Sequence, residues 1–243
     1  MGKFYKTVVE KVTADVVGNL CKVKQKIARA AVAAGRKPED ITLVAVSKNA
    51  SADAVARLVA AGHRDFGENR VQEGLRKMER IARPDVNWHL IGRVQTNKVK
   101  YIGSFHLLHS LDRWRLAVKL SEYALRTGQI FRCLVQVNVS EDPAKAGIEI
   151  TQVDQFLHAV AGLGGISIHG LMTITAVNAE PGQTFQWFKA LADKFAQLRE
   201  GKLPAGAEMK WLSMGMSADF ELAIAAGANM VRVGSAIFAE EGE

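Results

Sequence analysis

The sequence predicts an α/β protein built as a single (β/α)8 barrel, the TIM-barrel fold, with an extra long helix at its N-terminus. Eight short apolar segments each precede a segment of helical periodicity, and this alternation continues to the end of the chain. No stretch rich in Pro, Gly or Ser divides the chain, and 243 residues with 48% hydrophobic content suit one large core. We therefore expect one domain over residues 1–243, with residues 1–35 as a helix packed on the barrel. A doubly wound open sheet is the alternative, because alternation alone does not close a sheet.

Periodicity predicts the N-terminal helix and the first strand. From about Tyr5 to Ala34, apolar residues recur at helical spacing with lysines between them, and Gly35 ends the pattern. One helix, or two helices broken near Gly18, would fit this spacing. The stretch from Ile41 to Lys48 has seven uncharged residues followed by a lysine, which is typical of a buried strand.

The remaining elements are expected in strict alternation. Ser51 is placed to cap the next helix, because its hydroxyl can accept a hydrogen bond from a free N–H of the first turn. Short apolar runs bounded by turn residues predict strands at 63–66, 86–91, 105–110, 130–139, 166–174, 209–212 and 229–233. Helical periodicity occupies the segments between them, including 95–102, a helix that begins near Thr151, 183–199 and a last turn after Ser235.

Composition narrows the expected partners and compartment. Lys and Arg exceed Asp and Glu by 32 to 25, a net charge of +7, but the basic residues are scattered and no aromatic-interleaved basic stripe accompanies them, so no nucleic-acid partner is expected. Cys21 and Cys133 lie far apart and outside any CxxC motif, which suits a reducing, cytoplasmic setting. The N-terminus shows no secretory apolar core and no apolar run approaches a membrane span, so no membrane association is expected.

Lys48 is the first candidate functional residue, because it stands at the C-terminal end of a predicted buried strand. In (β/α)8 barrels the functional site lies at this end of the strands. An amine held there with little solvation would be neutral more of the time and a better nucleophile, as Schiff-base formation requires. The alternative is a structural lysine whose amine simply reaches water.

Two loops after the last two predicted strands are suited to an anion. Ser213-Met214-Gly215-Met216-Ser217 and Gly234-Ser235 combine hydroxyls with backbone N–H groups just before a helix, where the helix dipole favours negative charge. Their glycines leave room for close approach of a ligand. Each loop alone is also typical of ordinary helix capping. Because (β/α)8 barrels often hold phosphate at the loops after strands seven and eight, we expect a phosphate site here.

Arg232 lies in the last apolar strand. Period-two alternation directs Arg232 and Gly234 to one face and their apolar neighbours to the other. An arginine inside a barrel needs a partner, because burying it unpaired is costly; a structural carboxylate or the ring nitrogen of a ligand would serve. A ligand with an aldehyde for Lys48, a ring acceptor for Arg232 and a phosphate for the two loops matches pyridoxal 5′-phosphate (PLP).

Longer motifs then extend over nearly the whole chain. They are Ala45-Val46-Ser47-Lys48, Phe66-Gly67-Glu68-Asn69-Arg70-Val71-Gln72-Glu73, Trp88-His89-Leu90-Ile91-Gly92-Arg93-Val94-Gln95-Thr96-Asn97-Lys98, Gly170-Leu171-Met172, Leu212-Ser213-Met214-Gly215-Met216-Ser217 and Val231-Arg232-Val233-Gly234-Ser235-Ala236-Ile237-Phe238. Through them the chain resembles the pyridoxal phosphate homeostasis protein family (YggS/PROSC type).

The resemblance implies a barrel like the N-terminal domain of alanine racemase, with PLP bound as an internal aldimine. The residues that would contact PLP all follow predicted strand ends: Lys48 as the Schiff-base lysine, Asn69 near the cofactor, Arg232 at the pyridine nitrogen, and Ser213, Gly234 and Ser235 at the phosphate. The implied function is intracellular PLP homeostasis, by buffering or delivery. The implied partners are PLP itself and PLP-dependent apoenzymes or amino acids, and we expect a monomer or a weak homodimer.

This chain departs from the family pattern in four places. Ser235 stands where Thr is usual, and the change keeps the hydroxyl. Arg93-Val94 stands where His or Pro and then Leu are common, which adds a positive charge near the site. An acidic pair that some members carry after Ser217 is reduced here to Ala218-Asp219, and the tail from Ala239 to Glu243 is acidic. The roles of Arg93 and of the tail stay open.

The sequence favours a carrier with little or no turnover, and an amino-acid racemase or another slow PLP-dependent enzyme is the alternative. A racemase needs a second acid/base opposite the lysine, and none of Tyr5, Tyr101 and Tyr123 falls in a strand-end loop. An arginine at the pyridine nitrogen would also weaken PLP as an electron sink. No catalytic residue is therefore assigned. A Lys-dependent aldolase has no need of Arg232, and no metal site is expected because the six histidines are dispersed without HxH or HExxH spacing.

Overall fold

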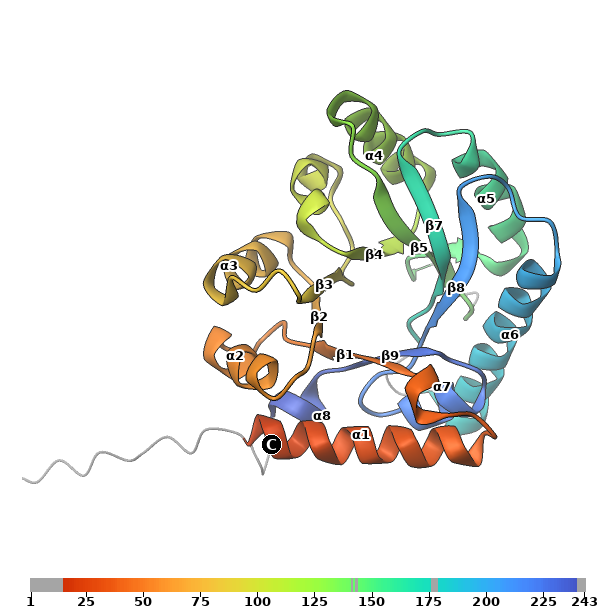
Figure 1. Ribbon diagram of the computed structural model, residues 1–243. Coiled ribbons are helices and arrows are strands. Elements are labelled where there is room, and N and C mark those ends of the chain that lie inside the picture. The colour runs from red at the N-terminus through yellow and green to blue at the C-terminus, as the bar shows by residue number, and fades with distance from the viewer. Residues whose placement is uncertain (1–14, 141, 143, 176–178, 240–243) are drawn as a thin grey trace, which may run out of the picture.

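The chain folds into a closed ring of parallel strands surrounded by helices (Figure 1). The computed structural model describes residues 15–239 except 141, 143 and 176–178. The ring consists of β1 (Thr42–Val46), β2 (Asp65–Glu68), β3 (Asn87–Leu90), β4 (Leu107–Leu111), β5 (Phe131–Asn138), β7 (Ile166–Met172), β8 (Ala207–Ser213) and β9 (Met230–Val233). Hydrogen bonding follows the order β4-β3-β2-β1-β9-β8-β7-β5, and β5 pairs with β4. This last pairing closes the ring, so the (β/α)8 barrel prediction is confirmed and the open-sheet alternative is wrong.

Helices cover the outer face of the ring between successive strands. They are α1 (Val16–Ala33), α2 (Ala52–Ala60), α3 (Val71–Ile81), α4 (Trp114–Thr127), α5 (Val153–Ala161), α6 (Pro181–Glu200), α7 (Phe220–Ala225) and α8 (Ser235–Phe238), with 3-10 helices η1 (Pro38–Asp40), η2 (Thr96–Ser104) and η3 (Ile150–Gln152). Ser51 caps α2 as predicted, since its hydroxyl accepts from the N–H of Ala54 at 3.1 Å. The segment predicted as a short helix at 95–102 is the 3-10 helix η2.

Most predicted strand limits shift by one or two residues, and two differences, at β2 and β6, change the description of the sheet. The second strand begins at Asp65, two residues later than predicted, and runs on through Gly67 and Glu68, which pair with β3. Gly67 suits this position because a Cβ there would lie 3.0 Å from the side chain of Val44. The two-residue strand β6 (Ile148–Glu149), which pairs only with β5, was not predicted because it is too short to show a period.

The N-terminal helix α1 lies along the outside of the ring, in contact with α2, α7 and α8 (Figure 1). Its buried residues are at the predicted helical spacing: Val16, Leu20, Val23, Ile27 and Ala31. Gly18 does not break it, because the carboxylate of Asp15 accepts from the Gly18 N–H at 3.0 Å and caps the first turn. The part of the predicted helix before residue 15 lies outside the described residues. Among the helices that the structure describes, none is both long and apolar enough to span a bilayer.

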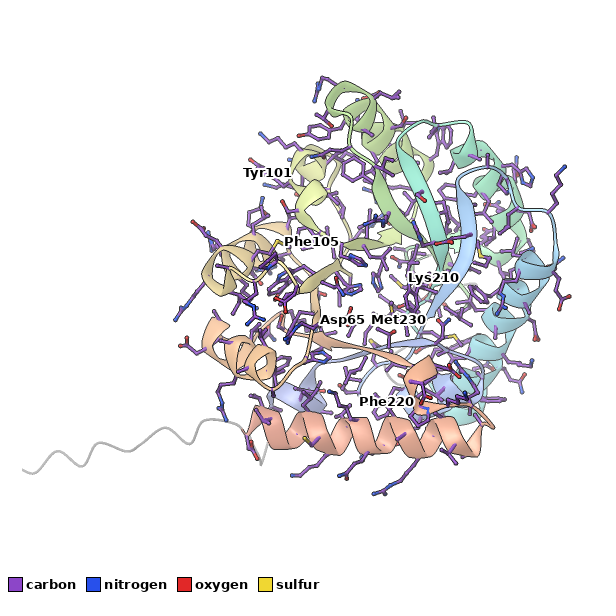
Figure 2. All side chains as sticks on the ribbon, in the orientation of Figure 1. Asp65, Tyr101, Phe105, Lys210, Phe220 and Met230 are labelled. Atoms are coloured by element: carbon purple, nitrogen blue, oxygen red, sulfur yellow. The ribbon has the colours of Figure 1, made fainter. Side chains whose placement is uncertain are left out.

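The apolar core has two layers. The larger layer fills the space between the strands and the surrounding helices. A smaller cluster fills the interior of the ring: Val44, Leu107, Leu134, Met172 and Met230, with Trp211 against it. Figure 2 labels Met230 inside the ring, where β9 begins. Because inward positions alternate along each strand, the cluster is followed by a polar layer nearer the C-terminal strand ends, and the site is built there.

A candidate ligand-binding pocket at the carboxyl end of the barrel

A pocket of about 660 Å³ opens at the C-terminal ends of the barrel strands. Six residues were expected to contact PLP, and five of them line this pocket: Lys48, Asn69, Arg232, Gly234 and Ser235. They follow β1 and β2 or lie in and after β9, and these three strands are neighbours in the ring. Residues almost two hundred positions apart therefore face one cavity, at the end of the barrel where function is normally found.

Lys48 leaves the barrel directly after a tightly anchored residue. Ser47 is fully buried, its hydroxyl donates to Oε1 of Glu68 at 2.6 Å, and its carbonyl accepts from the amine of Lys77. Lys77 also pairs with Oε1 of Glu68 at 2.6 Å. Lys48 itself is exposed at the pocket. The residue as a whole is thus more exposed than the sequence suggested, while the hydrogen bonds of Ser47 fix the backbone from which Lys48 extends.

Arg232 reaches the pocket from inside the ring, and only 3% of it is exposed. Its Nη1 donates to the hydroxyl of Ser213 at 2.7 Å and its Nη2 to the carbonyl of Thr173 at 2.8 Å. Burial lowers the pKa of Arg232 to about 10, and the charge of Asp219 partly offsets this. Within the described part of the chain, Arg232 makes no ion pair with a carboxylate. Of its two possible partners, the structural carboxylate is thus not in contact.

Two backbone N–H groups converge at the start of α8. The N–H groups of Gly234 and Ala236 both point to the hydroxyl of Ser217, at 3.2 and 3.4 Å. Ser217 and Gly234 both line the pocket. Donors that converge on one oxygen in this way can also receive an oxygen of an anionic ligand.

The loop after β8 contributes differently from the sequence prediction. Gly215 has φ +90°, and a Cβ there would lie 2.6 Å from the Cβ of Ala223, so this glycine allows packing against α7 and not the approach of a ligand. Ser213 is fully buried and is not among the residues that line the pocket. Its hydroxyl contacts Arg232 and, at 3.2 Å, Nδ1 of His109. The structure places Ser213 below the pocket, and Ser217 is the serine of this loop that lines it.

Two further cations line the pocket, Arg93 and Lys145. Nε of Arg93 donates to Oδ2 of the buried Asp112 at 2.8 Å, while 65% of the Arg93 side chain stays exposed. With Lys48 and Arg232 they make four cations, and no carboxylate stands among the described lining residues. The departure of Arg93 from the family pattern was a signal for this residue, whereas no motif indicated Lys145. The charge suits an anionic ligand.

This arrangement has defined chemical capacities. It offers a primary amine, a buried guanidinium with N–H groups to spare, and a pair of backbone N–H groups that bond the Ser217 hydroxyl and that an anion can use in its place. These fit a ligand with an electrophilic carbon, a ring acceptor and a phosphate, as PLP has. Among the residues described, no group of three or more His, Cys, Asp or Glu side chains is placed to hold a metal ion.

Comparison with known proteins places the chain in a family. The sequence model of the alanine racemase N-terminal domain family matches residues 19–241 of this chain. The pyridoxal phosphate homeostasis protein of Escherichia coli is 40% identical over 228 residues, covering 92% of this chain and 96% of that protein. The protein of the same name from Pseudomonas aeruginosa is 41% identical over 224 residues, covering 92% of this chain and 94% of that one.

Solved structures agree. PipY of Synechococcus elongatus, in a structure with PLP bound, is 32% identical, has a TM-score of 0.79, and the match covers 93% of this chain and 100% of PipY. Alanine racemase of Corynebacterium glutamicum is 18% identical with a TM-score of 0.69, over 93% of this chain and 63% of the racemase, which shows a shared fold alone. The chain therefore belongs to the pyridoxal phosphate homeostasis protein family, whose barrel is that of the alanine racemase N-terminal domain.

Proposed function

We propose that this protein binds PLP as a Schiff base with Lys48 and takes part in PLP homeostasis, by buffering or delivering the cofactor with little or no turnover. One observation carries the proposal: Lys48, Arg232 and Gly234 open into the same pocket at the carboxyl end of the barrel. Family membership supports it, as does the PLP bound in the PipY structure.

Each group would have a separate task. The amine of Lys48 would condense with the aldehyde, forming a C=N bond while the aldehyde oxygen leaves as water, and Arg232 would donate to the pyridine nitrogen. The N–H groups of Gly234 and Ala236, with the hydroxyls of Ser217 and Ser235, would hold the phosphate. In this proposal Ser213 acts through Arg232 and not at the phosphate, because it lies below the pocket lining.

The position of Arg232 supports a carrier over an enzyme. PLP, when bound, supplies an electron sink, and the sink is strongest when the pyridine nitrogen is protonated. A guanidinium is a donor only, so it favours the unprotonated nitrogen. Neither Tyr101, in η2, nor Tyr123, in α4, lines the pocket to act as the second acid of a racemase.

The Schiff base can be tested by the visible spectrum of the protein after incubation with PLP. We expect an absorbance band at a longer wavelength than that of free PLP. Borohydride should reduce and trap the Schiff base, and peptide mapping should find the label at Lys48. Lys48→Ala should abolish the band, whereas Lys145→Ala, which removes another pocket lysine, should retain it. A label on Lys145 or elsewhere would contradict the assignment.

Turnover can be tested separately by proton exchange. The PLP-loaded protein is incubated with L- and D-amino acids in heavy water and α-deuteration is followed by NMR. The carrier proposal expects no appreciable exchange above free PLP. Exchange that depends on Lys48 would instead support a racemase or another slow PLP-dependent enzyme.

The proposal extends to partners and compartment. PLP-dependent apoenzymes or amino acids would receive or compete for the cofactor, and the protein would act in the cytoplasm as a monomer or weak homodimer. The free thiols of the exposed Cys21 and the buried Cys133 support a reducing setting. Transfer of PLP from the loaded protein to an apoenzyme, measured as recovered apoenzyme activity, would test delivery.

A further inference from the structure

A continuous chain of hydrogen bonds crosses the interior of the barrel below the pocket. Oδ1 of Asp65 lies 3.1 Å from Nε2 of His89, and Nδ1 of His89 lies 3.0 Å from Nε2 of His109. Nδ1 of His109 lies 3.2 Å from the hydroxyl of Ser213, which in turn lies 2.7 Å from Nη1 of Arg232. These residues come from β2, β3, β4, β8 and β9, so the chain spans the ring.

One order of hydrogen bonds runs through this relay when both histidines are neutral, and the carboxylate of Asp65 sets it. The Ser213 oxygen accepts from the guanidinium, which only donates, and in this order it gives its own hydrogen to Nδ1 of His109. His109 then carries its hydrogen on Nε2 and donates to Nδ1 of His89. His89 in turn carries its hydrogen on Nε2 and donates to the carboxylate of Asp65, which only accepts. The carboxylate end therefore sets this order and the guanidinium end is compatible with it, so that each inner group donates once and accepts once.

The surroundings of His109 favour its neutral form. His109 is fully buried, and burial together with the neighbouring charges lowers its pKa well below the usual value. His106, whose ring centroid lies 5.7 Å from that of His89, is the other titratable ring beside it. The carboxylate of Asp65 also accepts from the side chain of Asn87 at 3.1 Å. The hydrogen bonds from His89 and Asn87 leave the pKa of Asp65 lowered, although burial raises it.

The relay connects the pocket with a second cleft, on the surface near the amino ends of β1 and β2. Arg232 lines the pocket at the carboxyl end. Asp65, the first residue of β2, lines a second cleft of about 630 Å³ at the opposite end, together with Thr42, His63 and Lys24. Figure 2 shows Asp65 beside β2 on the inner side of the ring. The side chain of Asp65 is 27% exposed and the residue lines this cleft, so the far end of the relay reaches solvent at the amino end of the strands.

We propose that Asp65, His89, His109 and Ser213 are positioning residues that hold the guanidinium of Arg232 toward the ligand, so that the cleft at the amino end of the barrel influences cofactor binding at the carboxyl end. The coupling to the cofactor rests on the proposed function. If these residues only satisfied buried polar groups, the hydrogen bonds would be needed, but each donor and acceptor could have either direction. The relay does need it, because Asp65 selects the tautomer of each histidine and thereby the hydrogen of Ser213.

The first test reads the relay without PLP. Nitrogen-15 NMR of the wild-type protein should show His89 and His109 as neutral Nε2–H tautomers at neutral pH. Asp65→Leu removes the terminal acceptor and should change the tautomer or the nitrogen shifts of both histidines. Asp65→Asn keeps an acceptor oxygen and should restore the wild-type pattern, and Asp85→Leu, at an exposed aspartate outside the relay, should leave it unchanged. A wild-type Nδ1–H tautomer at His109 would overturn the order of hydrogen bonds.

The second test reads the coupling to the pocket. Asp65→Leu should raise the PLP dissociation constant about two- to tenfold and shift the visible band, because a hydrogen bond that holds Arg232 is weakened. Asp65→Asn and Asp85→Leu should stay close to wild type. If the wild-type protein fails to bind PLP, the proposed function fails while the first test still reports on the relay. If the wild type binds and Asp65→Leu leaves both affinity and band unchanged, the positioning role is wrong.

Discussion

The guanidinium of Arg232 and the hydroxyl of Ser213 form one unit, joined by a 2.7 Å hydrogen bond inside the barrel. The sequence assigned them separate contacts, Arg232 to a ring nitrogen and Ser213 to a phosphate. In the structure Arg232 lines the pocket, and Ser213 lies behind it as its acceptor. Two fixed acceptors hold the guanidinium of Arg232, although its burial removes it from water. Burial of a cation in this way is typical of a residue that binds a ligand.

Replacing Ser213 should therefore weaken both the fold and the ligand site. Ser213→Ala leaves Nη1 of Arg232 and Nδ1 of His109 without a partner, and each lost buried hydrogen bond costs about 1–3 kcal/mol. We expect the free energy of unfolding in urea to fall by about 2–6 kcal/mol for the two groups together, and PLP affinity to fall as well. The control is Ser121→Ala, which changes a different buried serine, in α4. It should have little effect on the free energy of unfolding or on PLP affinity. Equal losses in the two variants would show that Ser213 has no special relation to Arg232.

The order of strands and the positions after them could be predicted from the sequence, because both depend on local patterns. A charge-free run ended at Lys48, and alternation placed Arg232 and Gly234 on one face. The contacts of Ser213 could not be predicted in this way. They depend on which side chains meet across a closed ring, and its partner His109 stands over a hundred residues away.

The presence of four cations in the pocket lining could also not be predicted from the sequence. Lys145 comes from the loop after β5, a strand well separated from β1 in the ring, and its distance from Lys48 is fixed only by barrel closure. Local strand limits were missed for a different reason. Gly67 and Glu68 have poor strand propensity, yet both pair with β3 in the closed ring, where a Cβ at Gly67 would lie 3.0 Å from Val44.

Gly92 should be intolerant of a side chain. A Cβ at this position would lie 2.2 Å from the backbone oxygen of Asn69, and both residues line the pocket. We expect Gly92→Ala to lower the free energy of unfolding by about 1–3 kcal/mol and to weaken PLP binding as Asn69 shifts. Gly182→Ala in α6 is the matched control, because nothing lies within 4 Å of its added methyl. Denaturant unfolding of both variants checks this, and an unchanged Gly92→Ala protein would contradict it.

Acid should destabilise the fold through His63. Burial lowers its pKa from 6.5 to about 4, with the charge of Lys24 acting in the same direction. Between these values the unfolded chain binds a proton that the folded chain does not, so stability is present above pH 6.5 and is lost as the pH falls toward 4. From pH 7 to 5 this single group should remove about 2 kcal/mol.

Urea unfolding at the two pH values measures this loss. His63→Gln should flatten the pH dependence by a comparable amount, whereas His158→Gln, at an exposed histidine of α5, should follow the wild type. A wild-type slope that is unchanged in His63→Gln would assign the acid sensitivity to other groups, among them His109.

Arg93 should contribute to affinity through its charge and not through a fixed contact. Its Nε is tied to Asp112, which also pairs with Arg113, while most of the Arg93 side chain remains in solvent at the pocket. An exposed cation interacts with an anion by about 1 kcal/mol or less, so Arg93→Gln should raise the PLP dissociation constant by no more than about fivefold. Because mobile ions screen exposed charges, the difference from wild type should shrink as salt rises from about 0.01 to 1 M.

Arg70→Gln, at a 79% exposed arginine paired with Glu73, controls for net charge. If both variants lose the same affinity, the effect belongs to the overall charge of +7 and not to the pocket. A loss at Arg93 that persists in high salt would indicate a direct, desolvated contact with the ligand.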